Sequence, residues 1–209
     1  MQMLLLSLGL GALASHIRAG ARIGFVPTAG ETYADPTFVN DDRVRLKLLG
    51  YEVEDVDISR GQRRSLIAQI AKCDAIFVAG GNTFYLLQQI RASGIEDDLK
   101  AEIRAGKMYI GASAGAAIVG PTIDPIRTLD DAAAAPNLAS TNAMSLVNFV
   151  VLPHYGKEKY LPRYEAIQKE YGQQYKLIPL TDQQAIRVSA DGTHAVIESE
   201  LVLHPMPST

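Results

Sequence analysis

Residues 109–120, with the sequence YIGASAGAAIVG, decide the fold that this chain is expected to adopt. The stretch begins in an apolar run, residues 107–110, that reads as a strand, and it ends in small helix-forming residues. Between them, residues 111–115 match the pattern G-x-S-x-G, in which a tight strand-to-helix turn projects a serine hydroxyl out of the fold. This context makes Ser113 a candidate nucleophile.

A helix that begins at this serine also suits acyl-transfer chemistry. Free N–H groups and the helix dipole favour negative charge at a helix N-terminus, and a tetrahedral oxyanion carries such a charge. The alternative is a serine that only caps the helix, because serine is a favoured N-cap residue. The strand that precedes Ser113 favours the nucleophile over the cap.

The rest of the chain alternates strands with helices, which predicts an α/β protein with a doubly wound, mostly parallel sheet in three layers. Strands are expected at residues 3–8, 22–27, 51–58, 75–79, 149–152, 176–180 and 185–188, and helices at 38–49, 63–71, 84–92, 96–104 and 161–171. Residues 121–136 read as a loop excursion, and residues 194–198 with 201–204 resemble a terminal hairpin. With no internal repeat and no linker, residues 1–209 are expected to form a single domain.

Composition and charge narrow the class of protein. The chain has 209 residues, of which 47 % are hydrophobic and 21 % charged, with a net charge of −3; this is typical of a soluble globular protein. No basic stripe indicates nucleic-acid binding, and no apolar run is long enough to span a membrane. The N-terminal apolar run lacks the basic residues that begin a signal peptide, so we interpret it as a strand. The single cysteine, Cys73, excludes an internal disulfide, and we expect a cytoplasmic protein.

A serine nucleophile needs a base to take its proton and a further group to orient that base. His154 directly follows a predicted strand, so it is expected at the same edge of the sheet as Ser113. Asp182 lies between two predicted strands, where it could accept a hydrogen bond from the second ring nitrogen of His154. It could equally be a turn aspartate that bonds its own backbone, and these two roles stay open here.

Two glycines, Gly80 and Gly81, follow another predicted strand. They form either an ordinary helix entry or a turn whose N–H points at the substrate oxygen, with the Ala114 N–H as the second donor of an oxyanion hole. The chain lacks a dinucleotide fingerprint, a P-loop and any cluster of metal ligands at metal-binding spacing. No metal and no cofactor is therefore expected.

These motifs together resemble a known family. The segments FVAGGNT at residues 77–83 and GASAGA at 111–116 are similar to peptidase E, the aspartyl dipeptidase family that also includes cyanophycinase. The supporting matches are FVPTA at 25–29, PTI at 121–123 and LPHY at 152–155, so the resemblance covers nearly the whole chain. It implies a fold similar to class I glutamine amidotransferases, with serine where those enzymes carry cysteine. It also implies a serine peptidase that hydrolyses short peptides and needs no cofactor.

The resemblance further implies a Ser–His–acid triad, with Ser113 as the nucleophile and His154 as the base. The acid in the family is usually glutamate, in a segment resembling D-E-x-T-A, whereas this chain has TDQQA at residues 181–185 and so offers Asp182. Because aspartate is shorter than glutamate, Asp124 and Asp130, in the loop after the nucleophile, are competitors for the third position.

The resemblance also leads to an expectation about the substrate and the residues that bind it. Family members that prefer an N-terminal aspartate, and so cleave Asp-X dipeptides, need a cation for its carboxylate. Arg163 is the main candidate, a solvated helix residue being the alternative, and Asn82 beside the glycine pair is a second candidate for substrate binding. Other cations that flank the predicted edge are Arg127, Lys157 and Lys159. We expect a small peptide as the binding partner and a monomer or homodimer. Two rival functions are an α/β-hydrolase esterase that uses Ser113, Asp182 and His204, and a non-catalytic amidotransferase-like binding module.

Overall fold

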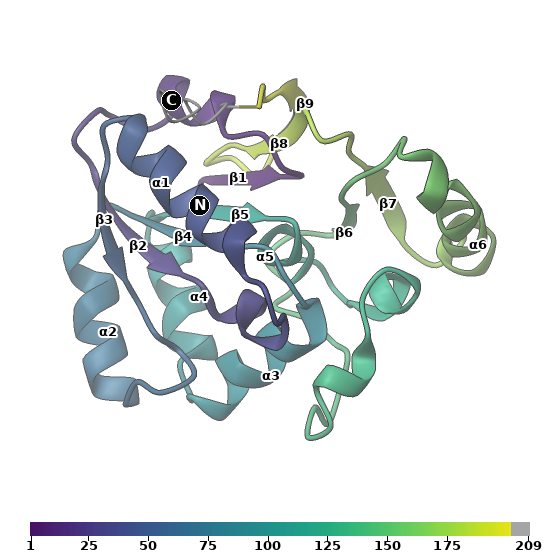
Figure 1. Ribbon diagram of the computed structural model, residues 1–209, viewed down its shortest axis with the longest axis horizontal. Coiled ribbons are helices and arrows are strands. Elements are labelled where there is room, and N and C mark those ends of the chain that lie inside the picture. Colours follow the sequence, from purple (N-terminus) through teal and green to yellow (C-terminus); the bar gives the residue numbers. More distant parts are fainter. Residues whose placement is uncertain (202–209) are drawn as a thin grey trace.

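The computed structural model describes residues 1–201, apart from the side chain of Lys159, and is built around a seven-stranded sheet (Figure 1). The strand order is β3-β2-β4-β5-β1-β8-β9. The strands are β1 (Met3–Leu6), β2 (Arg22–Val26), β3 (Glu52–Asp55), β4 (Ala75–Val78), β5 (Met108–Ala112), β8 (Gln184–Val188) and β9 (His194–Glu198). Strands β1 to β5 pair in parallel, whereas β8 is antiparallel to both β1 and β9.

The central strands are apolar along their whole length because helices cover both faces of the sheet. Strand β1 reads MLLL, and all four of its residues are buried. Met3 and Leu5 point into one core cluster, whereas Leu4 and Leu6 point into the other, as the two-residue period of a strand requires.

The helices divide between these two faces and complete three layers (Figure 1). On one face lie α2 (Arg63–Lys72), α3 (Thr83–Ala92), α4 (Glu96–Arg104) and the short α5 (Ala114–Ala117). On the other face lie α1 (Thr37–Leu48) and a 3-10 turn at Gly11–Ser15. The prediction of an α/β fold with a mostly parallel sheet is confirmed.

A second, two-stranded parallel sheet stands apart from the main one, at the right of Figure 1. It consists of β6 (Phe149–Leu152) and β7 (Lys176–Pro179), which α6 (Leu161–Tyr171) connects. The expected terminal hairpin between residues 194–198 and 201–204 is corrected in one respect. Strand β9 forms its hairpin with β8, because residues 189–193 provide the turn between them, and residues 202–204 lie outside the described part of the chain.

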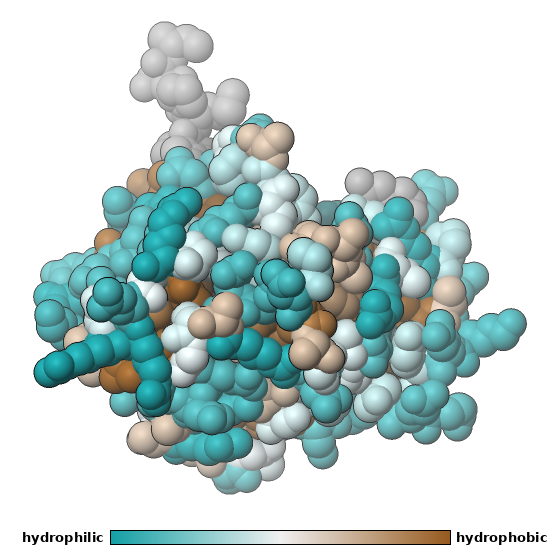
Figure 2. All heavy atoms as spheres, turned by 90° about the horizontal axis from the view of Figure 1, so that it is seen from below, coloured by the Kyte–Doolittle hydropathy of each residue, from teal (hydrophilic) through white to brown (hydrophobic). Residues whose placement is uncertain are grey.

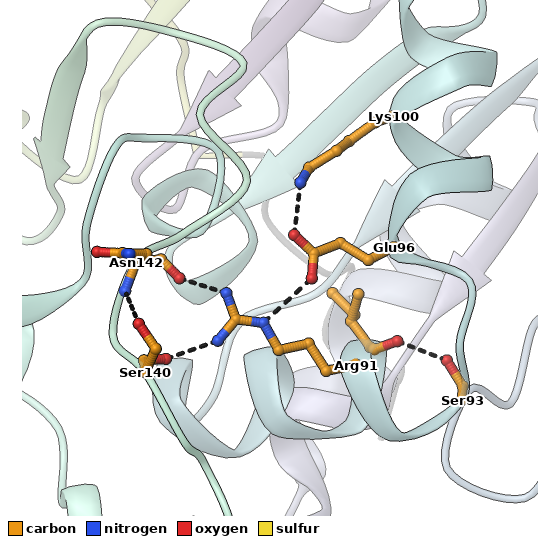
Figure 3. A network of polar contacts seen from close by, with 7 residues as sticks. Arg91, Ser93, Glu96, Lys100, Ser140 and Asn142 are labelled. Carbon is orange, nitrogen blue, oxygen red and sulfur yellow. Dashed lines mark hydrogen bonds and ion pairs between the residues drawn. The ribbon is translucent and has the colours of Figure 1, made fainter.

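The loop that follows α5 is tied to the body of the protein by Arg91 (Figure 3). The Arg91 guanidinium donates to the backbone carbonyls of Ser140 and Asn142, at 2.6 and 2.5 Å. Glu96 on α4 accepts from Arg91 Nε at 3.1 Å and orients it. The excursion at residues 121–148, with 3-10 turns at Asp124–Thr128 and Ala132–Ala134, is thus held by contacts to α3 and α4.

The surface seen in Figure 2 is mostly hydrophilic, with apolar residues in small patches between polar ones. Within residues 1–201, no helix has both the length and the apolar character needed to cross a membrane.

Candidate active site

Ser113 lies on the sharp turn between β5 and α5 and has a strained backbone. Its φ is 49° and its ψ −105°, a backbone conformation that residues other than glycine rarely adopt. Gly115 permits the turn, because a Cβ at this position would lie 2.2 Å from the carbonyl oxygen of Val78. Beneath the turn, the buried Tyr109 hydroxyl donates to the Gly115 carbonyl at 2.7 Å. These contacts hold the serine at the carboxyl end of β5.

The segments that follow β5 in the main sheet and β6 and β7 in the small sheet bring Ser113, His154 and Asp182 together. The Ser113 Oγ lies 3.0 Å from the His154 Nε2, and the His154 Nδ1 lies 2.7 Å from the Asp182 Oδ1. A carboxylate only accepts hydrogen bonds, so its contact assigns the imidazole proton to Nδ1 and leaves Nε2 free to accept from the serine. This is the arrangement in which a histidine can take the proton of a serine hydroxyl.

Two further residues hold the histidine and the carboxylate: Ser7, which the sequence reasoning missed, and Lys157, which it placed near the site as a possible partner for the substrate. His154 has a left-handed backbone, with φ 64°, and its N–H donates to the buried Ser7 hydroxyl at 2.8 Å. The Ser7 Oγ also makes a long contact of 3.5 Å with the Asp182 Oδ1. The Lys157 Nζ pairs with the other oxygen, Oδ2, at 2.7 Å. Ser7 directly follows β1, so its position at a strand end was the available signal.

The surroundings of Asp182 keep this carboxyl group ionised. Burial by itself would raise the pKa of Asp182, but hydrogen bonds from Lys157 and His154 outweigh burial and hold the pKa below its ordinary value. A carboxylate in this state accepts a hydrogen bond from the His154 Nδ1–H at neutral pH.

Ser113 and His154 open into a cavity of about 450 Å³. Its walls come from the strand ends and from α1, α6 and the loop after α5. The lining includes Ser7, Tyr33, Phe38, Asp41, Asp42, Arg45, Gly80, Gly81, Thr83, Ile126, Leu129, Asp130, Pro153, Tyr160 and Tyr164.

Gly81 and Ala114, the expected oxyanion donors, differ in their backbone setting. Gly81 has φ 140°, and a Cβ there would lie 2.1 Å from the Ala29 carbonyl oxygen, so only glycine fits. Ala114 is the first residue of α5, where N–H groups have no partner within the helix.

Asp124 and Asp130, the competing acids from the loop after α5, have other hydrogen-bond partners than His154. Asp130 lines the cavity, and its Oδ2 accepts from the Thr83 N–H and hydroxyl at 2.9 and 2.6 Å. Burial raises the pKa of Asp130, although these hydrogen bonds and nearby His154 act in the opposite direction. Asp124 bonds to Thr122 and Arg127. Neither carboxylate has a hydrogen bond to the His154 ring among the described contacts.

Comparison with known proteins identifies the family. The model of peptidase family S51 matches residues 10–196. This chain belongs to peptidase family S51. It is therefore a serine peptidase, as the resemblance to peptidase E implied.

Relatives with known sequences and structures agree. An uncharacterized peptidase of Listeria monocytogenes is 36 % identical over 167 residues, which cover 80 % of this chain and 82 % of the relative. A peptidase E of Streptomyces coelicolor is 32 % identical over 146 residues, which cover 70 % of this chain and 56 % of that protein. A crystal structure from L. monocytogenes, described as a candidate peptidase E, has a TM-score of 0.86 at 31 % identity and covers 94 % of this chain and 98 % of that one.

In this S51 peptidase, the two residues expected to bind substrate make structural contacts. The Asn82 side chain caps α3 by accepting from the Tyr85 N–H at 2.9 Å, and it donates to the Asp131 carbonyl at 2.8 Å. Arg163 donates to the Thr128 carbonyl at 3.2 Å and lies over the Tyr160 ring. Neither is among the residues that line the cavity.

The remaining candidates have other surroundings. Lys157 pairs with Asp182, and Arg127 pairs with Asp124. The side chain of Lys159 and the whole of His204 lie outside the described part. Within the described chain, no group of three or more histidine, cysteine, aspartate or glutamate side chains is placed to hold a metal ion.

The cavity also contains a buried acid that sequence reasoning missed, Asp42 on α1. Burial raises the pKa of Asp42 from 3.8 to about 7, although the Arg45 guanidinium acts in the opposite direction. An apolar pattern could not have identified it, since α1 is only weakly amphipathic.

Asp42→Asn should change how the stability of the protein depends on pH. The folded state binds the Asp42 proton more tightly than the unfolded state, so the wild-type free energy of unfolding should fall as pH rises from about 4 to about 7. Asp42→Asn lacks this loss. Its free energy of unfolding relative to wild type should therefore increase by up to about 4 kcal/mol between the lower and the upper end of that window. Urea unfolding at pH 4 and pH 8 measures the difference. Asp41→Asn, which removes the less buried neighbouring carboxylate, is the matched control; parallel wild-type and Asp42→Asn curves would contradict the expectation.

Proposed function

We propose that this S51 peptidase hydrolyses short peptides through a covalent acyl-enzyme, with Ser113 as the nucleophile. The observation that carries the proposal is the 3.0 Å contact between the Ser113 Oγ and the His154 Nε2. As Oγ attacks the scissile carbonyl carbon, Nε2 takes its proton, and the carbonyl oxygen becomes an oxyanion. The protonated His154 then gives that proton to the leaving amine, so the C–N bond breaks and the acyl group stays on Ser113.

The other groups stabilise charge during these steps. Asp182 holds the tautomer of His154 and stabilises the imidazolium that forms. The N–H groups of Gly81 and Ala114 are the proposed donors to the oxyanion, helped by the N-terminal position of Ala114 in α5. A water molecule then attacks the ester, with His154 again as the base, and releases the acid product. The proposal includes no metal and no cofactor.

The cavity supports a small substrate. A volume of about 450 Å³ is within the usual range of small-molecule sites and suits a dipeptide or a little more. The Asp130 carboxylate lines this space, and its burial makes a cationic partner favourable, which a free peptide α-ammonium group provides. We include Asp-X dipeptides among the candidate substrates.

A panel of dipeptides that varies only the N-terminal residue tests this proposal. We expect the purified protein to release free amino acids from several members, and we expect a fluorophosphonate to label Ser113. The matched control is the same panel with acetylated N-termini, which should be poor substrates if Asp130 binds the free amine. No labelling and no cleavage of any peptide would refute the proposed reaction.

The esterase alternative requires His204 as the base. The contact between Ser113 and His154 favours the peptidase, because a second histidine would have to displace a base that is already in place. Much faster cleavage of a p-nitrophenyl ester than of every peptide, together with loss of activity in His204→Ala, would favour the esterase instead.

A further inference from the structure

Arg45, on α1, lines the same cavity as Ser113 and His154. Its Nη1 donates to the Asp42 Oδ1 at 3.3 Å, and 22 % of its side chain is exposed. Its Nε is buried, and no hydrogen-bond partner for it exists among the described residues. Buried donors of a charged group are rarely left unpaired, so a guanidinium in this state at the wall of a cavity needs an explanation.

No other lysine or arginine whose side chain the structure describes lines this cavity. Of the other cations near the active site whose side chains are described, Lys157 pairs with Asp182, Arg127 pairs with Asp124, and Arg163 donates to the Thr128 carbonyl. Among the side chains that the structure describes, Arg45 is therefore the arginine or lysine that a substrate in this cavity meets.

The charges around Arg45 also leave its guanidinium available to bind an anion. Burial raises the pKa of Asp42, so at neutral pH this neighbour neutralises the guanidinium only in part. The side chains of Tyr33 and Phe38 also line this cavity and add apolar surface to it. Asp41 and Asp130 also line the cavity, so it presents charges of both signs, as a zwitterionic peptide does.

We propose that the Arg45 guanidinium binds a carboxylate of the peptide substrate and thereby sets its specificity. The inference rests on the proposed peptidase function and adds to it a residue that determines specificity. The planar fork of arginine matches a carboxylate with two parallel hydrogen bonds. That carboxylate has two possible sources in a short peptide: the side chain of an acidic N-terminal residue, or the free C-terminus.

Four dipeptides separate the sources: Asp-Leu, Ala-Leu, Asp-Leu-amide and Ala-Leu-amide. If the acidic side chain is bound, wild type prefers the Asp peptides with either C-terminus. If the C-terminus is bound, wild type prefers both free acids over both amides. In either case Arg45→Met should lower kcat/KM for the preferred peptides by about 10- to 100-fold, mainly through KM, since this contact is made in both ground and transition states. Arg45→Lys should retain part of the preference, because it keeps the charge without the fork.

The controls separate binding from folding. Arg43→Met removes a neighbouring arginine on the same helix that pairs with Asp55 and does not line the cavity, so its preference should equal that of wild type. Arg45→Met leaves Asp42 buried without its partner, so the double variant Arg45→Met/Asp42→Asn is compared with Asp42→Asn alone. Fluorophosphonate labelling of Ser113 should proceed at the wild-type rate in all of these proteins.

The outcomes distinguish this inference from the proposed function. An unchanged substrate preference in Arg45→Met and in the double variant, with labelling intact, overturns the role of Arg45 and leaves the peptidase standing. An equal loss on all four peptides overturns it as well, because it indicates a structural effect. If wild type cleaves nothing, calorimetric binding of the four peptides to Ser113→Ala, with and without Arg45→Met, decides the question: unchanged affinity overturns the inference, and a loss confined to carboxylate-bearing peptides supports it.

Discussion

Ser113→Ala should abolish peptide hydrolysis while the protein remains folded. The variant removes the oxygen that attacks the carbonyl, and the loss in kcat should be on the order of 10⁶-fold, as expected when a triad nucleophile is deleted. Stability should change little, because Ser113 lines the cavity and the described hydrogen bond of its hydroxyl is to His154, another residue of the cavity wall. Hydrolysis of a dipeptide by the purified variant and its thermal unfolding curve are the two measurements.

The controls for this prediction use the fact that the effects of mutations in a catalytic triad are not additive. His154→Ala should be about as damaging, and the double variant Ser113→Ala/His154→Ala should be no worse than either alone. Ser113→Ala with substantial turnover would refute the nucleophile, and additive losses in the double variant would show that the two residues do not act together.

Asp182→Asn should lower kcat by on the order of 10⁴-fold. The amide can donate where the carboxylate only accepts, so it favours the tautomer of His154 whose Nε2 carries the proton and cannot take another from Ser113. The ion pair with Lys157 is also lost, but Asp182 is partly exposed, so thermal stability should change little. Steady-state kinetics and a thermal unfolding curve test both parts.

Variants of two aspartates in the loop after α5 test the assignment of the acid. Asp124→Asn should leave kinetics near wild type, because Asp124 bonds to Thr122 and Arg127 outside the cavity. Asp130→Asn should raise KM for peptides with a free amine and leave fluorophosphonate labelling intact. If one of these variants loses labelling and Asp182→Asn does not, the triad acid has been assigned to the wrong residue.

The local chemistry of the sequence determined most of the fold. The apolar runs of the parallel strands can be buried only under helices on both faces, and the expected strands and helices appear within a few residues of their predicted bounds. The G-x-S-x-G turn is local in the same sense, since its glycines must allow the strained backbone of Ser113. The pairing of β9 with β8 was missed because strand pairing depends on which neighbour is available, which no local pattern contains.

The surroundings of the serine were decided only by the tertiary structure. Spacing could not show which of Asp182, Asp124 and Asp130 contacts His154, because the segments after β6 and β7 of the small sheet meet the end of β5 only in the folded chain. Ser7 contacts Asp182 across 175 residues of sequence. Arg45 lines the cavity from α1, which covers the face of the sheet opposite α5. A contact of this kind depends on how layers pack and on which charges remain unpaired after packing, so residue type and spacing along the chain do not reveal it.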